Sequence, residues 1–346
     1  MSALQLRPWL LGLTATIIAL LVLFIETMLN ADSDGTLLLT LSFWITLAQG
    51  PVAVVAAAEA SQGKWIRSLK YDLLAFYPLI LFMAFIFLIL YFKMDIYPWI
   101  SESHQWLNVN SFLLRNFVLL VISFLLAHFY ARASLKEKSS RGKLAVLFLL
   151  SFVISQSLVA ADWVMSLEYP WMSTMFAPLF FIESFYAGLA IGAILSVMLL
   201  MKKNDNADDI QKVMRDMALF MFGFALAWAG LYYGQYLVIW YGNIPWETSF
   251  FAKRMHDPVF NVMMYLIIFI LFILPFLGFL SQKSKKARMW VLSVSVLILL
   301  GILIERIFYI LPVVGINPII FSLEFVLIGF FFYLIGVNRH KIISVS

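Results

Sequence analysis

The chain alternates long apolar runs with short polar connections, and ten of the runs are long enough to cross a bilayer. A transmembrane helix needs about 20 predominantly apolar residues. No connection is long enough to suggest a separate soluble domain, so the pattern predicts an all-α integral membrane protein with one transmembrane domain over 1–346. The predicted spans are 9–29, 37–59, 73–92, 112–131, 144–165, 174–199, 217–240, 258–280, 289–310 and 318–338.

The composition supports a protein surrounded by membrane lipid. Of the 346 residues, 63% are hydrophobic and only 12% are charged, whereas a soluble domain carries about a quarter charged residues. The net charge of +5 fits the positive loops of membrane proteins and does not indicate a nucleic-acid partner. The chain has no cysteine, which excludes disulfides, cysteine-ligated iron–sulfur clusters and thioether-attached haem within it.

Lysine and arginine residues are distributed unequally between the two sides of the predicted bundle. With ten spans, both termini and the connections after every second span lie on one side. That side holds nineteen of the 24 basic residues, and cytoplasmic loops are the ones enriched in lysine and arginine. We therefore predict a multi-pass membrane protein with cytoplasmic N- and C-termini. The other five basic residues are Lys93, Arg115, Lys253, Arg254 and Arg306.

Ionisable side chains within the spans are the candidate functional residues, because charge in hydrocarbon is costly and usually faces the protein interior. Glu183 is the strongest candidate for a proton relay, since no basic residue lies near it in sequence. A rise of 1.5 Å per residue places it about 14 Å below the outer end of its helix. The proton-path candidates, most of them in the outer half of the bilayer, are Glu183, Asp162, Glu305, Arg306, Glu324, Glu26, Tyr232 and Tyr236.

Three interpretations of these residues remain open. Arg306 could neutralise Glu324 or Asp162 in a purely structural ion pair. The carboxyl groups could instead form a chain of protonatable groups, or they could line a quinone headgroup pocket. A haem held by two histidines is not expected, because His128 is the only histidine inside a span, and no metal site is predicted.

The two longest outer connections, 93–111 and 241–257, are rich in tryptophan, tyrosine and proline. Aromatic side chains at this level usually form an interfacial belt. The alternative is a docking surface for a periplasmic partner.

Five segments, taken in order, resemble the NrfD-like (polysulfide-reductase-like) membrane subunits of alternative complex III. The longest is DWVMSLEYPWMSTMF at 162–176, and another is QYLVIWYGNIPWET at 235–248. Shorter agreements occur at 63–67, 274–276 and 304–312. The match runs over nearly the whole chain and is nearest to the ActF-like branch of the family, although a histidine of the family's pattern is replaced here.

The resemblance implies a fold of two four-helix bundles, 37–165 and 174–310, flanked by helices 9–29 and 318–338. It also implies a cofactor-free, non-catalytic subunit of a quinol:cytochrome c oxidoreductase, which acts as a scaffold and offers a proton path. Haem c and iron–sulfur clusters are then expected in partner subunits. These partners would be a second, ActC-like subunit, a periplasmic iron–sulfur protein, multihaem and monohaem cytochromes c and, as a further candidate, a terminal oxidase.

Two alternatives to this function stay open. One is a quinol-binding subunit of the same kind of complex. The other is a secondary transporter, because Pro51, Pro78 and Pro275 interrupt predicted spans and broken helices line many transporter sites.

Overall fold

The computed structural model describes residues 7–30, 34–101, 105–202 and 207–345, and this part of the chain consists of helices and their connections. Ten of its helical segments are long and apolar enough to cross a membrane. The predicted all-α integral membrane fold is therefore confirmed.

Each span is built around one long helix. The ten are α1 (Pro8–Phe24), α2 (Thr36–Ala60), α4 (Pro78–Ile89), α5 (Val109–Leu135), α6 (Arg141–Leu158), α7 (Phe176–Met201), α8 (Ala207–Gly242), α10 (Pro258–Ile268), α12 (Arg288–Ile310) and α13 (Pro318–Val345). Three shorter helices are α3 (Lys70–Leu74), α9 (Pro245–His256) and α11 (Leu274–Gly278).

Several spans change their helical geometry along their length. Segments of π-helix follow α1 at Ile25–Leu29, follow α6 at Val159–Val164 and join α10 to α11 at Phe269–Ile273. Tighter 3₁₀ turns occupy Leu90–Ile96, Pro98–Ser101, Met165–Glu168 and Ser284–Lys286. The first two π-helical segments carry Glu26 and Asp162.

Three local features differ from the sequence prediction. Helix α8 begins at Ala207, ten residues before the predicted start, because Asp208 and Asp209 favour the first turn of a helix. The predicted span 73–92 is divided before Pro78, which starts α4 as a first-turn proline. Helix α2 instead continues through Pro51 without a break.

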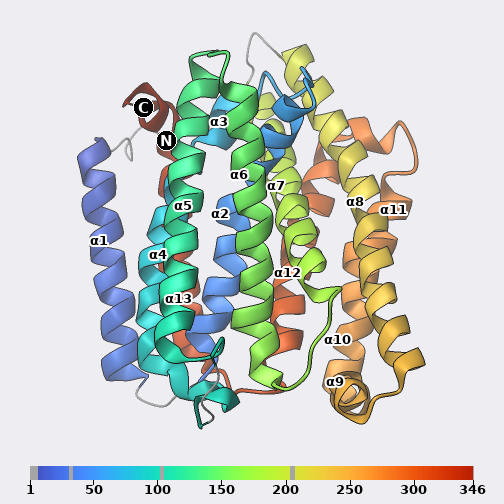
Figure 1. The fold of residues 1–346 in the computed structure, drawn as a ribbon. Helices are drawn as coiled ribbons and strands as arrows, with labels where there is room; N and C mark the ends of the chain where they lie inside the picture. The colour runs from blue at the N-terminus through green and yellow to red at the C-terminus, as the bar shows by residue number, and fades with distance from the viewer. Residues whose placement is uncertain (1–6, 31–33, 102–104, 203–206, 346) are drawn as a thin grey trace.

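The helices stand side by side, and the two ends of the bundle differ in character (Figure 1). We call one the basic end; it carries Arg7, α3, the turn between α5 and α6, and the end of α13. We call the other the α9 end, because α9 lies across it. The described chain begins and ends at the basic end (Figure 1).

Helix α2 lies at the centre of the molecule and is buried along nearly its whole length. It packs closely against α7 because both helices have a glycine at the crossing. A Cβ atom on Gly50 would lie 2.1 Å from the Ser184 carbonyl oxygen, and one on Gly188 would lie 2.3 Å from the Gly50 backbone. Small residues allow such close approach between transmembrane helices.

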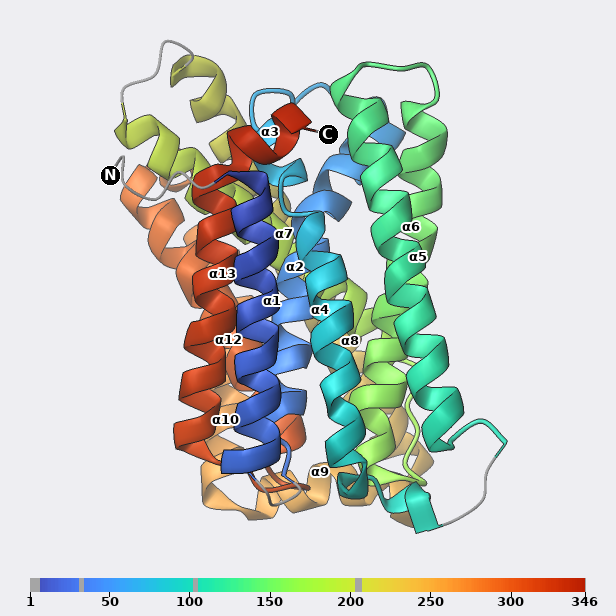
Figure 2. The ribbon, with the colours of Figure 1, turned by 90° about the vertical axis from the view of Figure 1, so that its left-hand side faces the viewer.

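The remaining helices surround this pair. Helices α4, α5 and α6 pack together beside α2, whereas α8 and α12 pack against α7 and α10 packs against α12. Helices α1 and α13 lie side by side on the face that Figure 2 turns toward the viewer. The division into two four-helix bundles stays a prediction, since α2 and α7 join both groups in one core. Large apolar side chains such as Leu13, Leu114 and Val262 face outward, as expected for contact with lipid.

Candidate functional site

Three helices bring titratable and aromatic side chains together in the α9-end half of the bundle. We call this group the central cluster and define it by Glu183 of α7, Trp228 and Tyr232 of α8, and Glu305, Arg306 and Tyr309 of α12. Glu183 lies seven residues after the start of α7, and Glu305 lies five before the end of α12. These positions correspond to about 10 Å and 8 Å along the helix axes. Glu183, Glu305 and Arg306 are fully buried.

Arg306 is the cation that contacts Glu183. Its Nη2 atom lies 2.5 Å from Glu183 Oε2, and its guanidinium carbon lies 3.7 Å from the centre of the Phe180 ring. The structure therefore corrects two expectations: Glu183 does have a basic neighbour, and Arg306 pairs with neither Glu324 nor Asp162. The two residues are 123 positions apart, so their sequence spacing does not reveal the contact.

The second carboxyl group of the central cluster belongs to Glu305. Its side chain interacts with that of Glu183, and its Oε1 atom accepts a hydrogen bond of 2.9 Å from the Tyr309 hydroxyl. Glu183 Oε1 accepts a bond of 3.2 Å from the Trp228 indole. Two carboxyl groups and one guanidinium have no net charge only when one carboxyl group holds a proton, and a buried site strongly favours neutrality.

Several polar atoms of the central cluster have no hydrogen-bond partner within the described part of the chain. They are Arg306 Nε, Nη1 and Nη2, Glu183 Oε2, Glu305 Oε2 and the Tyr232 hydroxyl. The close contact between Arg306 and Glu183 thus has the distance of an ion pair without the alignment of a hydrogen bond. Buried polar atoms of this kind are normally satisfied. The ion pair and the contact between the two carboxyl groups account for part of the set, while Arg306 Nε, Arg306 Nη1 and the Tyr232 hydroxyl can still donate or accept.

An aromatic cavity of about 430 Å³ lies directly beside the central cluster. Trp228 and Tyr232 belong to both, and the Trp228 indole donates to Glu183, so the cavity borders the cluster. Tyr236, which is half-buried, lines the cavity and contacts the Phe251 ring at 5.6 Å. The candidates Tyr232 and Tyr236 therefore lie together, with Tyr232 toward the buried charges.

A second buried group, which we call the α1–α13 cluster, contains Glu26, Lys93 and Glu324. Lys93 Nζ lies 3.2 Å from Glu26 Oε2, and the Glu324 side chain interacts with Glu26. Glu324 also accepts a hydrogen bond of 3.2 Å from Thr40 of α2. This cluster repeats the composition of the central cluster, with two carboxyl groups and one cation.

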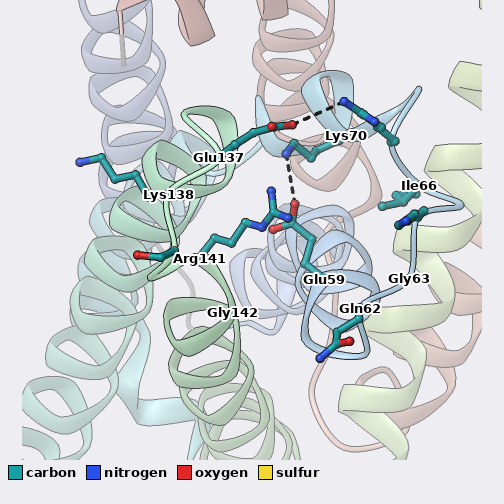
Figure 3. Close-up of a pocket in the computed structure, with 12 residues that line it drawn as sticks. Glu59, Gln62, Gly63, Ile66, Lys70, Glu137, Lys138, Arg141 and Gly142 are labelled. Carbon is teal, nitrogen blue, oxygen red and sulfur yellow. Dashed lines mark hydrogen bonds and ion pairs between the residues drawn. The ribbon is translucent and has the colours of Figure 1, made fainter.

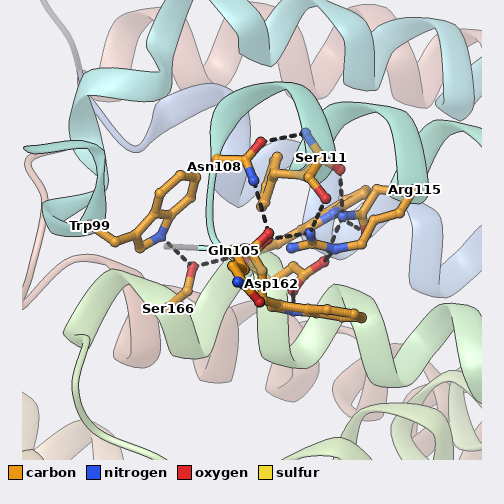
Figure 4. A network of polar contacts seen from close by, with 11 residues as sticks. Trp99, Gln105, Asn108, Ser111, Arg115, Asp162 and Ser166 are labelled. Atoms are coloured by element: carbon orange, nitrogen blue, oxygen red, sulfur yellow. Dashed lines mark hydrogen bonds and ion pairs between the residues drawn. The ribbon is translucent and has the colours of Figure 1, made fainter. Parts of the chain in front are cut away.

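Asp162 belongs to a third network, at the α9 end of α5 and α6 (Figure 4). Its Oδ2 atom accepts bonds of 2.7 Å from both Arg115 Nε and Asn116 Nδ2, and its Oδ1 atom accepts one of 3.4 Å from Trp106. Its backbone carbonyl accepts a hydrogen bond from the Ser166 hydroxyl. The carboxylate is thus paired with Arg115 and saturated with donors, which fits the structural interpretation for this residue.

The aromatic residues 97 and 99 are buried in the same network and do not form part of an exposed belt. The Tyr97 hydroxyl donates to the Trp163 carbonyl at 2.9 Å, and the Trp99 indole donates to Ser166 at 3.1 Å. Burial, with an added effect of the Asp162 carboxylate, raises the pKa of Tyr97 well above its ordinary value. In the other aromatic connection, Trp240, Tyr241 and Trp246 are exposed, as expected both of an interfacial belt and of a docking surface.

Arg254 of α9 is fully buried, although the sequence pattern places it only among the basic residues of an outer loop. Its guanidinium donates to the carbonyl oxygens of Phe250, Phe308 and Tyr309 at 2.8–3.0 Å and lies 2.5 Å from Glu168 Oε1. These contacts fasten α9 to the end of α12. The sequence does contain one signal for this role. Only five basic residues lie on the α9-end side, so each of them is a candidate for a specific buried contact.

Ion pairs also occur at the basic end, so buried charge is less one-sided than predicted. Lys70 lies 3.1 Å from Glu59, and Arg339 pairs with Asp72. In the middle of the bundle, Gln49 bonds to Ser123, Ser155 and Gln156 at 2.9–3.2 Å.

The described ranges contain no group of three or more metal-ligating side chains. His128 lies among the rings of Tyr77, Phe124 and Phe129, His256 is exposed, and His104 lies outside the described residues.

Comparison of the chain with models of known protein families, and with curated proteins, finds no match. The residues of the chain and their geometry therefore carry the functional argument.

Proposed function

We propose that this chain is a cofactor-free, NrfD-like membrane subunit of a quinol:electron-acceptor oxidoreductase resembling alternative complex III, in which it acts as a scaffold and offers a proton path. The proposed location is the bacterial inner membrane, with the basic end in the cytoplasm and the α9 end facing the periplasm. The five ordered motifs support the family, and nineteen of 24 basic residues on one side support the orientation.

The central cluster is the observation that carries the proton path. Glu183 and Glu305 contact each other beside one arginine in the buried interior, so the charge balance favours a single shared proton. Trp228 and Tyr232 connect the cluster to the aromatic cavity near the α9 end. On the other side, Gly50 of α2 touches the backbone beside Glu183, and its neighbour Gln49 begins the polar network at mid-membrane.

The described polar side chains do not form a continuous path from the central cluster to the basic end. On α2 the next carboxyl group after Gln49 is Glu59, about 15 Å further along the helix, and the α2 residues at 52–58 between them are apolar. Proton exchange is therefore proposed to occur first toward the α9 end, through Tyr232 and the aromatic cavity.

Affinity purification of the tagged chain from its native membrane tests the family assignment. We expect haem c and iron–sulfur proteins, together with a second NrfD-like subunit, to be recovered with it. Recovery of the chain alone, combined with substrate uptake by proteoliposomes that contain only this chain, contradicts the proposal and supports a transporter.

Glu183→Gln tests the proton path within that complex. The amide keeps the size of the side chain but cannot carry a proton, so we expect slower proton-coupled turnover with normal assembly. Glu247→Gln, on α9 and outside both clusters, is the matched control. Unchanged turnover and proton stoichiometry in Glu183→Gln exclude this residue from the path.

The aromatic cavity favours one second candidate function, quinol binding by this chain. Its volume of about 430 Å³ lies within the usual range for small-molecule sites, and Tyr232 has a hydroxyl without a partner among the described residues. A photoreactive quinone analogue is expected to label Trp228, Tyr232 or Tyr236 if the chain binds quinol. Labelling confined to a neighbouring subunit contradicts this second candidate and leaves the scaffold proposal intact.

A further inference from the structure

A polar cavity of about 570 Å³ opens at the basic end, and none of its lining residues belongs to the central cluster. Figure 3 shows the residues that line it. The connection after α2 forms one wall, the turn between α5 and α6 forms the other, and Glu59 of α2 lies at its base. The cavity is separate from the sites described above, and none of the functions proposed for the chain uses it.

Positive charge exceeds negative charge around this basic cavity. Five basic side chains line it, against two carboxylates, Glu59 and Glu137. Glu59 is neutralised by the buried Lys70 at 3.1 Å, and Glu137 lies 3.7 Å from the exposed Arg67. The other three basic residues have no carboxylate within 4.0 Å among the described residues; they are Lys64, Lys138 and Arg141.

The carboxylate at the base of the cavity does not oppose an incoming anion strongly. Glu59 already accepts hydrogen bonds from Lys70 at 3.1 Å, Tyr130 at 2.9 Å and Ser134 at 2.8 Å. Lys70 donates in addition to the Ser134 carbonyl at 2.8 Å. These bonds fix the base of the cavity, so the three remaining cations determine its charge.

The start of α6 adds further donors. Arg141 is the first residue of this 18-residue helix, whose first turn has no acidic residue and whose Ser140 makes no side-chain cap. A Cβ atom on Gly142 would have no neighbour within 4 Å, so the backbone there is open to the cavity. In Figure 3 the Arg141 side chain extends across the cavity toward Glu59. The positive end of the helix dipole thus lies beside the three cations.

We propose that the basic cavity binds the phosphate group of an anionic ligand through Lys64, Lys138, Arg141 and the start of α6. Arginine binds phosphate with two parallel hydrogen bonds, and lysine adds a point charge. In the orientation proposed above, the cavity faces the cytoplasmic leaflet, where anionic phospholipids are concentrated. The phosphate can belong to such a lipid headgroup or to a soluble phosphate compound of the cytoplasm.

Thermal unfolding of the delipidated, detergent-solubilised full chain tests this inference, because a ligand of the folded state raises the midpoint. The probes are phosphatidylglycerol, phosphatidylcholine and inorganic phosphate, each titrated separately. Arg141→Gln removes one cavity charge. Lys143→Gln removes the same charge two positions further along the helix, outside the cavity, and is the matched control. Gly142→Asp places a carboxylate in the open space, where an acidic residue also favours the start of a helix.

We expect phosphatidylglycerol, and not phosphatidylcholine, to stabilise the chain if the ligand is a lipid, and inorganic phosphate to do so if the ligand is soluble. Arg141→Gln should weaken binding about fivefold, the effect of about one unit charge at a membrane surface, and Gly142→Asp should weaken it at least as much. Lys143→Gln should bind normally. Equal weakening in Arg141→Gln and Lys143→Gln indicates diffuse attraction and overturns the proposal, as does the absence of stabilisation by either phosphate probe.

Discussion

Replacing Arg306 by methionine removes the cation that contacts Glu183 and keeps a side chain of similar length against the Phe180 ring. The folded variant then has two fully buried carboxyl groups, Glu183 and Glu305, with no guanidinium beside them. To remain neutral, the central cluster must bind one proton more than it does with Arg306 present. The free energy needed to bind that extra proton is the expected loss of stability.

The magnitude follows from the ordinary acidity of glutamic acid. Adding a proton to such a group at pH 7 costs about 4 kcal/mol, which agrees with the usual 3–5 kcal/mol for breaking a buried pair. The folded variant binds more protons than its unfolded chain, so its stability relative to the wild type recovers as the pH falls. The recovery is about 1.4 kcal/mol per pH unit, which leaves a deficit of about 1 kcal/mol at pH 5.

Reversible unfolding in detergent at pH 7 and pH 5 measures this effect. The double variant Glu183→Gln, Arg306→Met is the control, because it has one carboxyl group left and needs no extra proton relative to the wild type. We expect the double variant to be markedly more stable than Arg306→Met at pH 7. Equal destabilisation of the two variants, or a loss that does not change with pH, refutes the charge-balance reasoning.

Three further predictions concern packing and anchoring. Gly188→Ala should lower the free energy of unfolding by about 1–3 kcal/mol, because the new Cβ meets the Gly50 backbone at 2.3 Å. Gly223→Ala, whose Cβ would have no neighbour within 4 Å, should not lower it. The thermal midpoints of the two variants test this. Arg254→Gln should speed hydrogen exchange in α9, because the bonds to α12 are lost, whereas exchange in exposed Lys253→Gln should stay normal. Asp162→Asn should destabilise the chain by about 3 kcal/mol, because Arg115 loses its counter-charge. A loss of unfolding free energy no larger than that of Glu247→Gln argues against an ion pair between Arg115 and Asp162.

The spans could be predicted from the sequence because each is a local pattern about twenty residues long. Every predicted span overlaps one of the ten in the structure, and the errors lie at the ends, as for α8. Helix α9 was missed because it is a short surface helix with mixed polarity, whose buried side chains include Arg254. A search for apolar runs cannot detect such a helix.

The candidate residues could be identified by type and depth, but their partners could not. Arg306 meets Glu183 from a helix more than a hundred residues away, and Lys93, assigned by the sequence to a loop, is buried against Glu26. Neither contact leaves a periodic signal, because it depends on which faces of distant helices meet. Asp162 and Glu183 look alike in the sequence, yet the Asp162 carboxylate accepts three side-chain hydrogen bonds, whereas Glu183 lies against a second carboxyl group and an arginine.

The central position of α2 has a consequence for how the chain is made. Among the ten described spans α2 is the second in chain order, but its polar side chains find partners only as later helices are synthesised. Gln49 meets residues 123, 155 and 156, the Thr46 carbonyl accepts from Ser184, and Thr40 donates to Glu324. The second span therefore completes its contacts only when the tenth has been synthesised. Chains that stop before α13 should remain incompletely assembled in the membrane and become substrates for quality-control proteases.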